Sequence, residues 1–345
     1  MTYLVIRFST VGSVAMLYPL ISSLSAHYPH DKFVVVSESL QALFGNMPNV
    51  DFVDAKAEKG RWKTTRMWSL SKKLKRDYDI DYVVDLQDSR ASQFLRRLLW
   101  SSCKEVVVMK KHRKRRELLI KQGYAKSEPL LTEFELYRDA FAEVGLEAKF
   151  DFDVLPHDKE ADLRINLLFG NKPAEEKWIG IAPFAKHKTN MLPYKLLKTV
   201  INDLSKRQQT KIFLFGAGEI ENEILNQWAS VYDNTYSISG KYSLKEELSL
   251  MRQLDLMVCM DSANQHFASL VGLRALTIWC GTHPYAGFYG WKQSPEDCMQ
   301  KELPCRPCTL HGKEKCRLGT FECQDFSADE IIKRADQCLN KQELN

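Results

Sequence analysis

The sequence contains no apolar run that approaches the roughly 20 residues needed for a membrane-spanning helix. Its first residues, MTYLVIRF, are typical of a strand. They lack the basic lead, apolar centre and small-residue cleavage site of a signal peptide. These absences predict a cytoplasmic protein whose contact with a membrane, from the cytoplasmic side, is peripheral.

Standard nucleotide fingerprints are missing as well. The spacing Gly-x-Gly-x-x-Gly does not occur, because the segment after the first expected strand has only Gly12, and residues 215–219 have only Gly216 and Gly218. No internal repeat of short period and no low-complexity segment is visible. The composition therefore predicts an ordinary globular chain without a dinucleotide motif.

What is present bounds the size and partners of the protein. With 345 residues and 44% apolar content, the chain is long enough for two hydrophobic cores. Lys and Arg total 49 against 44 for Asp and Glu, and this net charge of +5 suits a phosphate-bearing substrate without requiring nucleic acid. In a cytoplasmic protein the nine cysteines are expected to be mainly reduced thiols.

Two successive series of apolar strands alternate with helical periodicity, which predicts two doubly wound α/β domains. The expected strands are 3–8, 33–37, 50–53, 82–86 and 105–109, then 178–183, 211–215, 235–238, 256–260 and 275–279. Expected helices of the first series include 14–27, 61–77 and 91–100. We expect an N-terminal domain at 1–156, a C-terminal domain at 157–326 and a final helical segment at 327–345.

Parallel sheets bind ligands at the carboxyl ends of their strands, so a cleft between two such domains is the expected site. The final helix should begin at Ser327, with Glu330 completing a capping box, and pack back across the domain junction.

The most specific motif is Asp261-Ser262-Ala263-Asn264-Gln265-His266, which follows an apolar strand and opens a helix. Ser262 is expected to cap the helix, while the amides of Ala263 and Asn264 hold a pyrophosphate and His266 adds a hydrogen bond. The same pattern also fits a structural helix cap with an ordinary surface histidine.

Three further strand-end segments are candidates. Residues 182–193 contain Lys186, Lys188 and Asn190, and the lysines are placed to neutralise phosphate oxygens as a leaving group departs, although exposed loop lysines are often only solvated. Gly12, before Ser13, permits a tight backbone and close approach by a ligand, here the donor. Glu219 or Glu221, after Gly218, is a candidate acceptor for a ribose or base hydrogen bond, or else a capping acid.

Taken together, these segments resemble glycosyltransferase family 9, the lipopolysaccharide heptosyltransferases, over most of the chain. The specific similarity is Asp-Ser-x-x-x-His at 261–266 followed by Gly-Thr-x-Pro at 281–284. The resemblance implies a GT-B fold, an ADP-heptose-like donor, and inverting transfer to a lipid-anchored saccharide. It implies no cofactor, because lysine and helix-terminal amides hold the diphosphate without a metal.

The chain departs from the family pattern at two positions. Where the family usually has the Asp that is the presumed general base, this chain has Ser13, whose hydroxyl ionises too weakly for that role. Asn190 replaces a lysine that faces the donor phosphates, with Lys186 and Lys188 close enough to compensate. Either Asp88 is the base, or the protein binds its ligands and turns over poorly.

Residues 110–116, KKHRKRR, form a basic run after an expected strand. Lys110, Lys111 and Arg113 are candidate acceptor contacts, and the run suits nucleic acid, anionic lipid, lipid A-type phosphates or a solvated loop. Acceptor or membrane contact is favoured, because no nucleic-acid module or interleaved aromatic residue accompanies the run.

Four cysteines near the C-terminus, Cys305, Cys308, Cys316 and Cys323, have the number needed for a zinc site. Their later spacings are not those of a standard zinc finger, so free thiols or a local disulfide are favoured over a bound metal.

Overall fold

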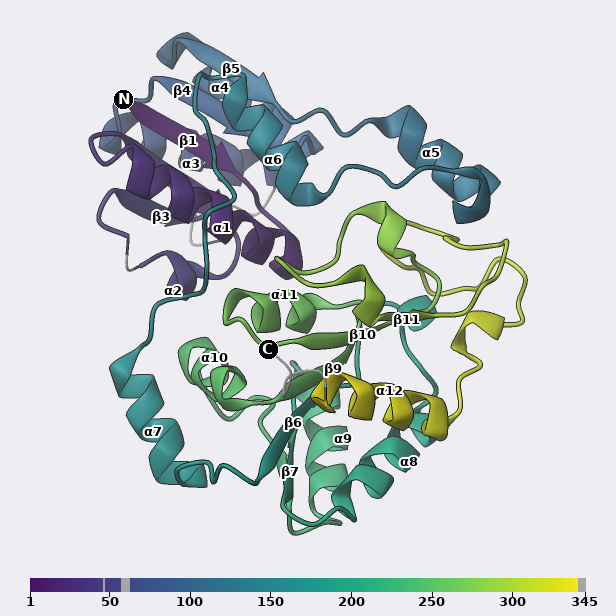
Figure 1. Cartoon of the computed structure of the whole chain (residues 1–345). Coiled ribbons are helices and arrows are strands. Elements are labelled where there is room, and N and C mark those ends of the chain that lie inside the picture. Colours follow the sequence, from purple (N-terminus) through teal and green to yellow (C-terminus); the bar gives the residue numbers. More distant parts are fainter. Residues whose placement is uncertain (46, 57–62, 341–345) are drawn as a thin grey trace. The chain divides into compact units, whose positions relative to one another are not determined.

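The computed structural model describes residues 1–45, 47–56 and 63–340. The chain divides into two compact units, each built on its own parallel sheet (Figure 1). Unit 1 comprises Met1–His112 and Leu131–Asp153, and unit 2 comprises Arg113–Leu130 and Val154–Asn345.

Unit 1 is a five-stranded sheet in the order β3-β2-β1-β4-β5, and all neighbouring strands are parallel. Its strands are β1 (Thr2–Ile6), β2 (Lys32–Ser37), β3 (Val50–Asp54), β4 (Tyr82–Asp85) and β5 (Glu105–Val108). Its helices are α1 (Val11–His27), α2 (Gln41–Phe44), α3 (Lys63–Asp77), α4 (Arg90–Leu99) and α6 (Glu133–Ala142). The central strand β1 is apolar throughout, and Leu4, Val5 and Ile6 are completely buried.

Unit 2 is a six-stranded parallel sheet in the order β11-β10-β9-β6-β7-β8. The strands are β6 (Lys177–Ala182), β7 (Thr210–Leu214), β8 (Thr235–Ser237), β9 (Leu256–Met260), β10 (Ala275–Trp279) and β11 (Cys298–Gln300). The helices are α5 (Arg113–Gln122), α7 (Lys159–Phe169), α8 (Tyr194–Ser205), α9 (Glu219–Ala229), α10 (Leu244–Gln253), α11 (Ala263–Leu270) and α12 (Ala328–Asn340). Strands β9 and β10 are buried along their whole length, as expected of strands covered on both faces.

The predicted α/β class with two doubly wound sheets is confirmed, and all ten predicted strands occur within one or two residues of their expected ends. Strand β11 was not predicted, because its three residues, Cys-Met-Gln, carry no β-branched or aromatic signal. The first helix begins at Val11, three residues earlier than expected. The first two residues of the predicted helix 61–77 lie outside the described residues.

The division of the chain differs in one segment from the continuous N-terminal domain expected at 1–156. Residues Arg113–Leu130 group with unit 2, because the Tyr124 amide donates to the Arg306 carbonyl and the Leu130 amide donates to the Tyr285 carbonyl. The chain therefore passes between the units after residues 112, 130 and 153.

The final helix starts as predicted. The Ser327 amide donates to the Glu330 carboxylate at 2.7 Å, and the Glu330 amide donates to the Ser327 hydroxyl at 3.1 Å. Helix α12 packs against α8, and Ile331 and Cys338 join the core of unit 2. Packing of this helix across the domain junction stays a prediction.

A buried ion pair anchors α6 to the sheet of unit 1. The Arg7 guanidinium, at the end of β1, lies 2.7 Å from the Glu133 carboxylate, and both side chains are less than a tenth exposed. Arg7 also donates to the Leu86 carbonyl, and the Tyr137 hydroxyl lies 3.1 Å from Glu133. These bonds compensate for burial of the two charges, and removal of one partner would leave the other uncompensated.

We expect Glu133→Ala to lower the free energy of unfolding by about 3–5 kcal/mol, because it leaves the buried Arg7 charge without a carboxylate partner. Glu143→Ala is the matched control, since Glu143 pairs with Lys110 at 2.7 Å on the surface. Exposed pairs contribute at most about 1 kcal/mol, so the control should change little. Urea unfolding followed by circular dichroism measures both. Equal losses in the two variants would show that the buried pair is not the anchor.

Candidate functional site

In both sheets the main candidate residues follow the two strands between which the strand order reverses, which is the usual ligand position in open α/β sheets. In unit 2 this point lies between β6 and β9, where Ala182 pairs in register with Cys259. The loop that follows β6 and the turn that follows β9 therefore leave the sheet side by side. The predicted loop 182–193 and the predicted motif 261–266 are brought together in this way.

Asp261 joins three strand-end segments of unit 2. Its carboxylate accepts hydrogen bonds from the Thr282 hydroxyl at 2.7 Å, the Gln265 amide at 3.0 Å and the Asn190 amide at 3.2 Å. These partners come from the turn after β10, from α11 and from the loop after β6. Desolvation by burial raises the pKa of Asp261 to about 6, and the bonds from Thr282 and Gln265 oppose that rise.

Ser262 occupies the N-cap position of α11, but its side chain caps nothing, which corrects the prediction. Its extended backbone leaves the hydroxyl buried and without a partner among the described residues. The first-turn amides of Ala263 and Asn264 are consequently not satisfied by that hydroxyl. A helix start of this kind can accept an anion at its N–H groups.

The two histidines of the motifs are buried and neutral. Burial lowers the pKa of His266 to about 3, and burial together with Arg306 lowers the pKa of His283 to about 3. Nδ1 of His283 accepts the Tyr285 amide at 3.1 Å, so the proton of the neutral ring lies on Nε2. The alternative of His266 as an ordinary surface residue is wrong, because this residue is 6% exposed.

Several polar atoms at these strand ends have no hydrogen-bond partner among the described residues. They are Ser262 Oγ, Gln265 Oε1, His266 Nδ1 and His283 Nε2. An unmade hydrogen bond at a buried polar atom costs about 1–3 kcal/mol. A ligand or water that reached these atoms would recover that cost. All four atoms belong to the two motifs at 261–266 and 281–284.

The lysine loop after β6 has an exposed part and a buried part. Lys186 and Lys188 are exposed, as a phosphate-contacting role requires. Asn190 is 3% exposed, with its amide directed to Asp261, so its position is that of a structural partner of the motif. Direct contact of these three residues with a donor stays a prediction.

The turn after β7 is closed by Glu221 and not by Glu219. Glu221 Oε2 accepts the Ala217 amide at 2.8 Å, which is the capping role expected of an acid after Gly-x-Gly. Glu219 is exposed at the first position of α9, after Gly218 with φ of 89°. Its role as a donor-binding residue stays a prediction.

Arg306 organises the cysteine-rich segment and was missed at the sequence level. Its fully buried guanidinium donates to the carbonyls of Trp279 at 2.9 Å, Thr282 at 2.7 Å and Lys301 at 2.7 Å. It donates to the Cys280 carbonyl as well. The segment is therefore fastened to the turn that carries Thr282 and His283. An Arg-Pro pair inside Cys-x-x-Cys was the available signal.

The four C-terminal cysteines are free thiols, so the structure contains no local disulfide between them. No group of three or more His, Cys, Asp or Glu side chains within the described part of the chain is arranged to hold a metal. Burial raises the pKa of Cys323 to about 11. For Cys316, burial also acts to raise the pKa, but backbone N–H groups of residues 318–321 outweigh it and lower the pKa.

In unit 1 the strand order reverses between β1 and β4, and both base candidates lie there. Gly12 and Ser13 are in the first turn of α1 and not in a separate tight turn. Close approach of a donor to Gly12 stays a prediction. The Ser13 hydroxyl is 3.3 Å from the Thr10 hydroxyl, and the Ser13 carbonyl is 3.0 Å from the Tyr137 hydroxyl.

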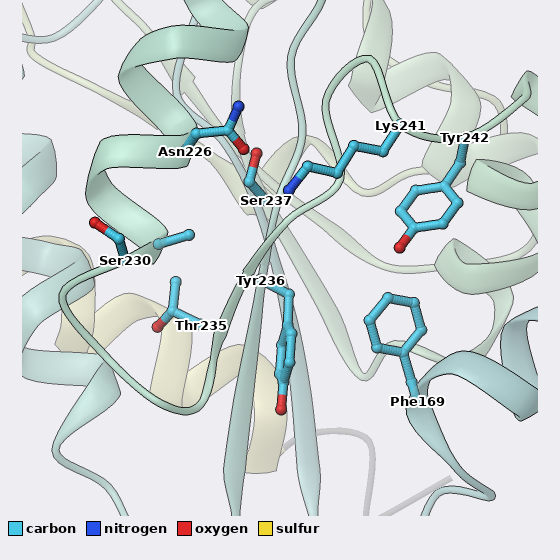
Figure 2. A pocket seen from close by; sticks show the side chains of 9 residues that line it. Phe169, Asn226, Ser230, Thr235, Tyr236, Ser237, Lys241 and Tyr242 are labelled. Atoms are coloured by element: carbon cyan, nitrogen blue, oxygen red, sulfur yellow. The ribbon is translucent and has the colours of Figure 1, made fainter.

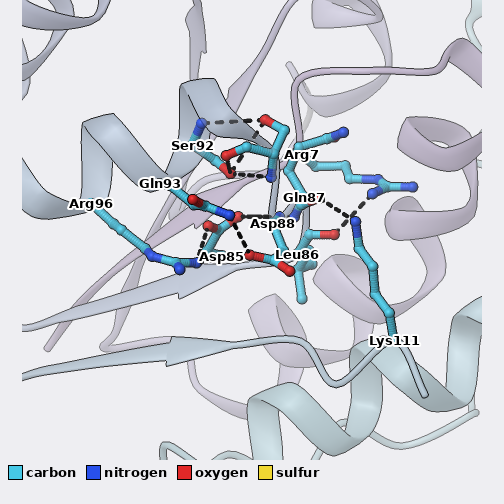
Figure 3. A network of polar contacts seen from close by, with 10 residues as sticks. Arg7, Asp85, Leu86, Gln87, Asp88, Ser92, Gln93, Arg96 and Lys111 are labelled. Atoms are coloured by element: carbon cyan, nitrogen blue, oxygen red, sulfur yellow. Dashed lines mark hydrogen bonds and ion pairs between the residues drawn. The ribbon is translucent and has the colours of Figure 1, made fainter. Parts of the chain in front are cut away.

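Asp88 is part of a polar network at the end of β4 (Figure 3). Its carboxylate lies 3.4 Å from Arg96 and 3.3 Å from the Gln93 amide. Arg96 also pairs at 2.8 Å with Asp85, a completely buried residue whose other oxygen accepts the amides of Gln87 and Asp88. Asp85 is thus structural, whereas Asp88 is 15% exposed and partly engaged.

The basic run is divided between the two units. Lys110 pairs with Glu143, and Lys111 donates to the Gln87 carbonyl at 2.5 Å, so its ammonium reaches the same network (Figure 3). Arg113 is exposed as the first residue of α5 and belongs to unit 2. The interpretation of the whole run as a loop is wrong. Acceptor contact by these three residues stays a prediction.

A cavity of about 340 Å³ lies beside the edge strand β8 (Figure 2). Thr235 and Ser237 lie on one face of this strand and Tyr236 on the other, as the alternation of strand side chains requires. Lys241, Tyr242 and Phe169 also line it. None of the predicted site residues does, so this cavity is separate from the strand ends that carry the motifs.

Solved structures of similar fold include Escherichia coli ADP-heptose lipopolysaccharide heptosyltransferase II, with a TM-score of 0.68 and 17% identity over 99% of this chain and 100% of that one. The family 9 glycosyltransferase of Veillonella parvula has a TM-score of 0.75 and 14% identity, covering 99% and 97%. These similarities show the GT-B fold that the sequence predicted.

Sequence comparison gives the same family. Lipooligosaccharide heptosyltransferase 2 of Campylobacter jejuni subsp. jejuni serotype O:2 is 22% identical over 346 residues, or 97% of each chain. The family model for glycosyltransferase family 9 (heptosyltransferase) matches residues 67–318. This span contains Asp261 with its three hydrogen-bond partners, the lysine loop and the Gly281–Thr282 turn. This chain therefore belongs to glycosyltransferase family 9, the heptosyltransferases.

Proposed function

We propose that this enzyme transfers a heptose, or a related sugar, from an ADP-sugar to a lipid-anchored saccharide of the lipopolysaccharide core, with inversion at the anomeric carbon. The observation that carries the proposal is the 2.7 Å hydrogen bond from Thr282 to Asp261. It unites the two motifs most specific to the family at the point where the strand order of unit 2 reverses.

In the proposed reaction unit 2 holds the nucleotide. The uncapped amides of Ala263 and Asn264 bind the diphosphate, His266 donates or accepts one hydrogen bond, and Lys188 offsets the charge that develops as ADP leaves. Asn190 supports this arrangement through Asp261. This set of donors neutralises the diphosphate without a metal, so we propose that none is required.

On the acceptor side, a saccharide hydroxyl attacks the anomeric carbon while the bond from that carbon to the diphosphate breaks. The hydroxyl proton passes to a base, for which unit 1 offers Asp88. Lys110, Lys111 and Arg113 are proposed to contact acceptor phosphates, and the enzyme is proposed to work at the cytoplasmic face of the inner membrane. No described helix has both the length and the apolar character to cross a bilayer.

A second candidate is a catalytically weakened protein that binds the sugar nucleotide without efficient transfer. Two observations favour it. Ser13 has no carboxylate to offer, and Oδ1 of Asp88 contacts both Arg96 and Gln93. Under this alternative ADP-sugar binding is retained while transfer is slow.

We expect His266→Ala to weaken ADP binding by about 1–3 kcal/mol, the usual cost of losing a hydrogen bond to a charged group. The matched control is His157→Ala, since His157 is exposed and pairs with Asp162 on α7. Isothermal titration calorimetry with ADP measures both variants. Unchanged affinity in His266→Ala would remove this histidine from the nucleotide site.

Lys188→Ala should lower kcat more than it weakens donor binding, because its ammonium stabilises charge that appears only as the diphosphate departs. Lys198→Ala, which removes an exposed ammonium from α8, should change neither quantity. Steady-state transfer assays and calorimetry separate the two effects. Loss of binding with unchanged kcat would contradict the leaving-group role.

Ser13→Asp tests the identity of the base. Position 13 lies in the first turn of α1, which contains no acid, so an aspartate there would be tolerated by the helix dipole. General-base catalysis typically contributes about 10²- to 10⁴-fold. If the wild-type protein lacks a base and position 13 faces the acceptor, we expect Ser13→Asp to raise the transfer rate by that order with donor affinity unchanged.

Asp88→Asn completes this experiment. If Ser13→Asp leaves the rate unchanged while Asp88→Asn abolishes transfer, Asp88 is the base of a working enzyme. If neither substitution alters the rate, the binding-protein alternative is favoured.

A further inference from the structure

Two tryptophans of unit 1 lie on the protein surface. Trp68 of α3 is 52% exposed, and Trp100, which directly follows α4, is 68% exposed. The other tryptophans that the structure describes, Trp178, Trp228, Trp279 and Trp291, are buried. Large aromatic side chains in water are costly unless a partner covers them, so this exposure points to an interaction surface.

Both exposed tryptophans belong to one helical layer. Met67, Leu70 and Leu74 of α3 and Leu95 and Leu99 of α4 are buried in a single core cluster with the sheet. The two helices pack against each other, so they cover the same face of the sheet and turn their remaining sides to solvent. Burial raises the pKa of Cys103, which follows α4, and the charge of Lys75 in the last turn of α3 opposes that rise.

This layer is strongly basic. Helix α3 and residues 90–100 together contain nine Lys or Arg and one acid, Asp77. Lys72, Lys75 and Arg97 are exposed. The nearest acid along the chain, Asp77, pairs with Arg76 at 2.8 Å. Arg96 also pairs with acids, Asp85 and Asp88, so the positive charge left on the surface includes Lys72, Lys75 and Arg97.

Exposed tryptophan surrounded by cations matches the chemistry of an anionic bilayer surface. The indole ring partitions into the headgroup region, and each Lys or Arg near the surface adds attraction to anionic lipid. Single-stranded nucleic acid fits less well. A base would have to stack on the indole face, but the Lys72 ammonium already lies over the Trp68 ring, 3.5 Å from its centre.

We propose that the cationic tryptophan face, defined as Trp68, Lys72, Lys75, Arg97 and Trp100, docks unit 1 on an anionic lipid bilayer. The proposal rests on the proposed function, because a lipid-anchored acceptor would bring the enzyme to a membrane. It assigns bilayer contact to α3 and α4 in place of the basic run at 110–116. Its residues are different from those assigned to the donor and the acceptor.

The test is co-sedimentation of the purified full-length protein with vesicles of phosphatidylglycerol and phosphatidylcholine. Vesicles of phosphatidylcholine alone are measured in parallel, and both are repeated at high salt. The wild-type protein should bind the anionic vesicles and be released by salt. We expect Trp68→Ala/Trp100→Ala and Lys75→Gln/Arg97→Gln each to weaken binding by roughly tenfold or more.

Matched controls come from unit 2. Leu163→Ala/Leu167→Ala removes two exposed apolar side chains of α7, and Lys195→Gln/Lys198→Gln removes two exposed cations of α8. Neither should change vesicle binding. All substituted side chains are exposed, and unchanged thermal unfolding verifies that each variant is folded.

Several results would overturn the proposal. These are equal losses in the controls, no preference for anionic vesicles, or a strong affinity for single-stranded oligonucleotides that the two test variants lose. A wild-type dimer that Trp68→Ala/Trp100→Ala converts to a monomer in sedimentation velocity would assign the face to a second copy instead. Vesicle binding is measured without donor, and transfer to a soluble acceptor is measured without vesicles, so failure of docking is distinguishable from failure of the proposed function.

Discussion

The carboxylate of Asp261 is the constraint on which the strand ends of unit 2 depend. Three segments far apart in the sequence end on its two oxygens, through Asn190, Gln265 and Thr282. Hydrogen bonds to a carboxylate are about twice as strong as neutral ones. They also fix direction, so the three strand-end segments share one geometry. Packing of the sheet brings the segments close together, and the shared carboxylate fixes their positions relative to one another.

Arg306 fixes the backbone of the turn that carries Thr282 by a different kind of contact. Its guanidinium is surrounded by carbonyl oxygens instead of a carboxylate, so it holds backbone in place without cancelling its own charge. Burial accordingly lowers the pKa of Arg306. The positive charge retained there is one reason that the neighbouring His283 stays neutral. A neutral imidazole with a fixed tautomer is a defined hydrogen-bond donor, which a titrating histidine would not be.

Sequence periodicity predicted the sheets because buried parallel strands are continuous apolar runs, and β9 and β10 matched to the residue. The motif at 261–266 was predictable because it joins a strand to a helix in a recognisable order. Partners separated by many residues were not predictable, because no local pattern links Arg7 to Glu133, or Arg306 to Trp279. The sequence pattern also does not predict which way a side chain points. Ser262 lies at the N-cap position, but its side chain does not cap the helix. Local chemistry predicts which groups occur, whereas tertiary packing decides which groups meet.

Neither compact unit is a continuous piece of polypeptide. Residues 131–153 return to unit 1 after 113–130 have packed with unit 2. A chain that emerged only as far as His112 would have a complete five-stranded sheet but no α6, and Arg7 would have no carboxylate to meet. Unit 1 therefore cannot be completed during synthesis until a segment of unit 2, residues 113–130, has been made. Its assembly and that of unit 2 are coupled by the path of the chain itself.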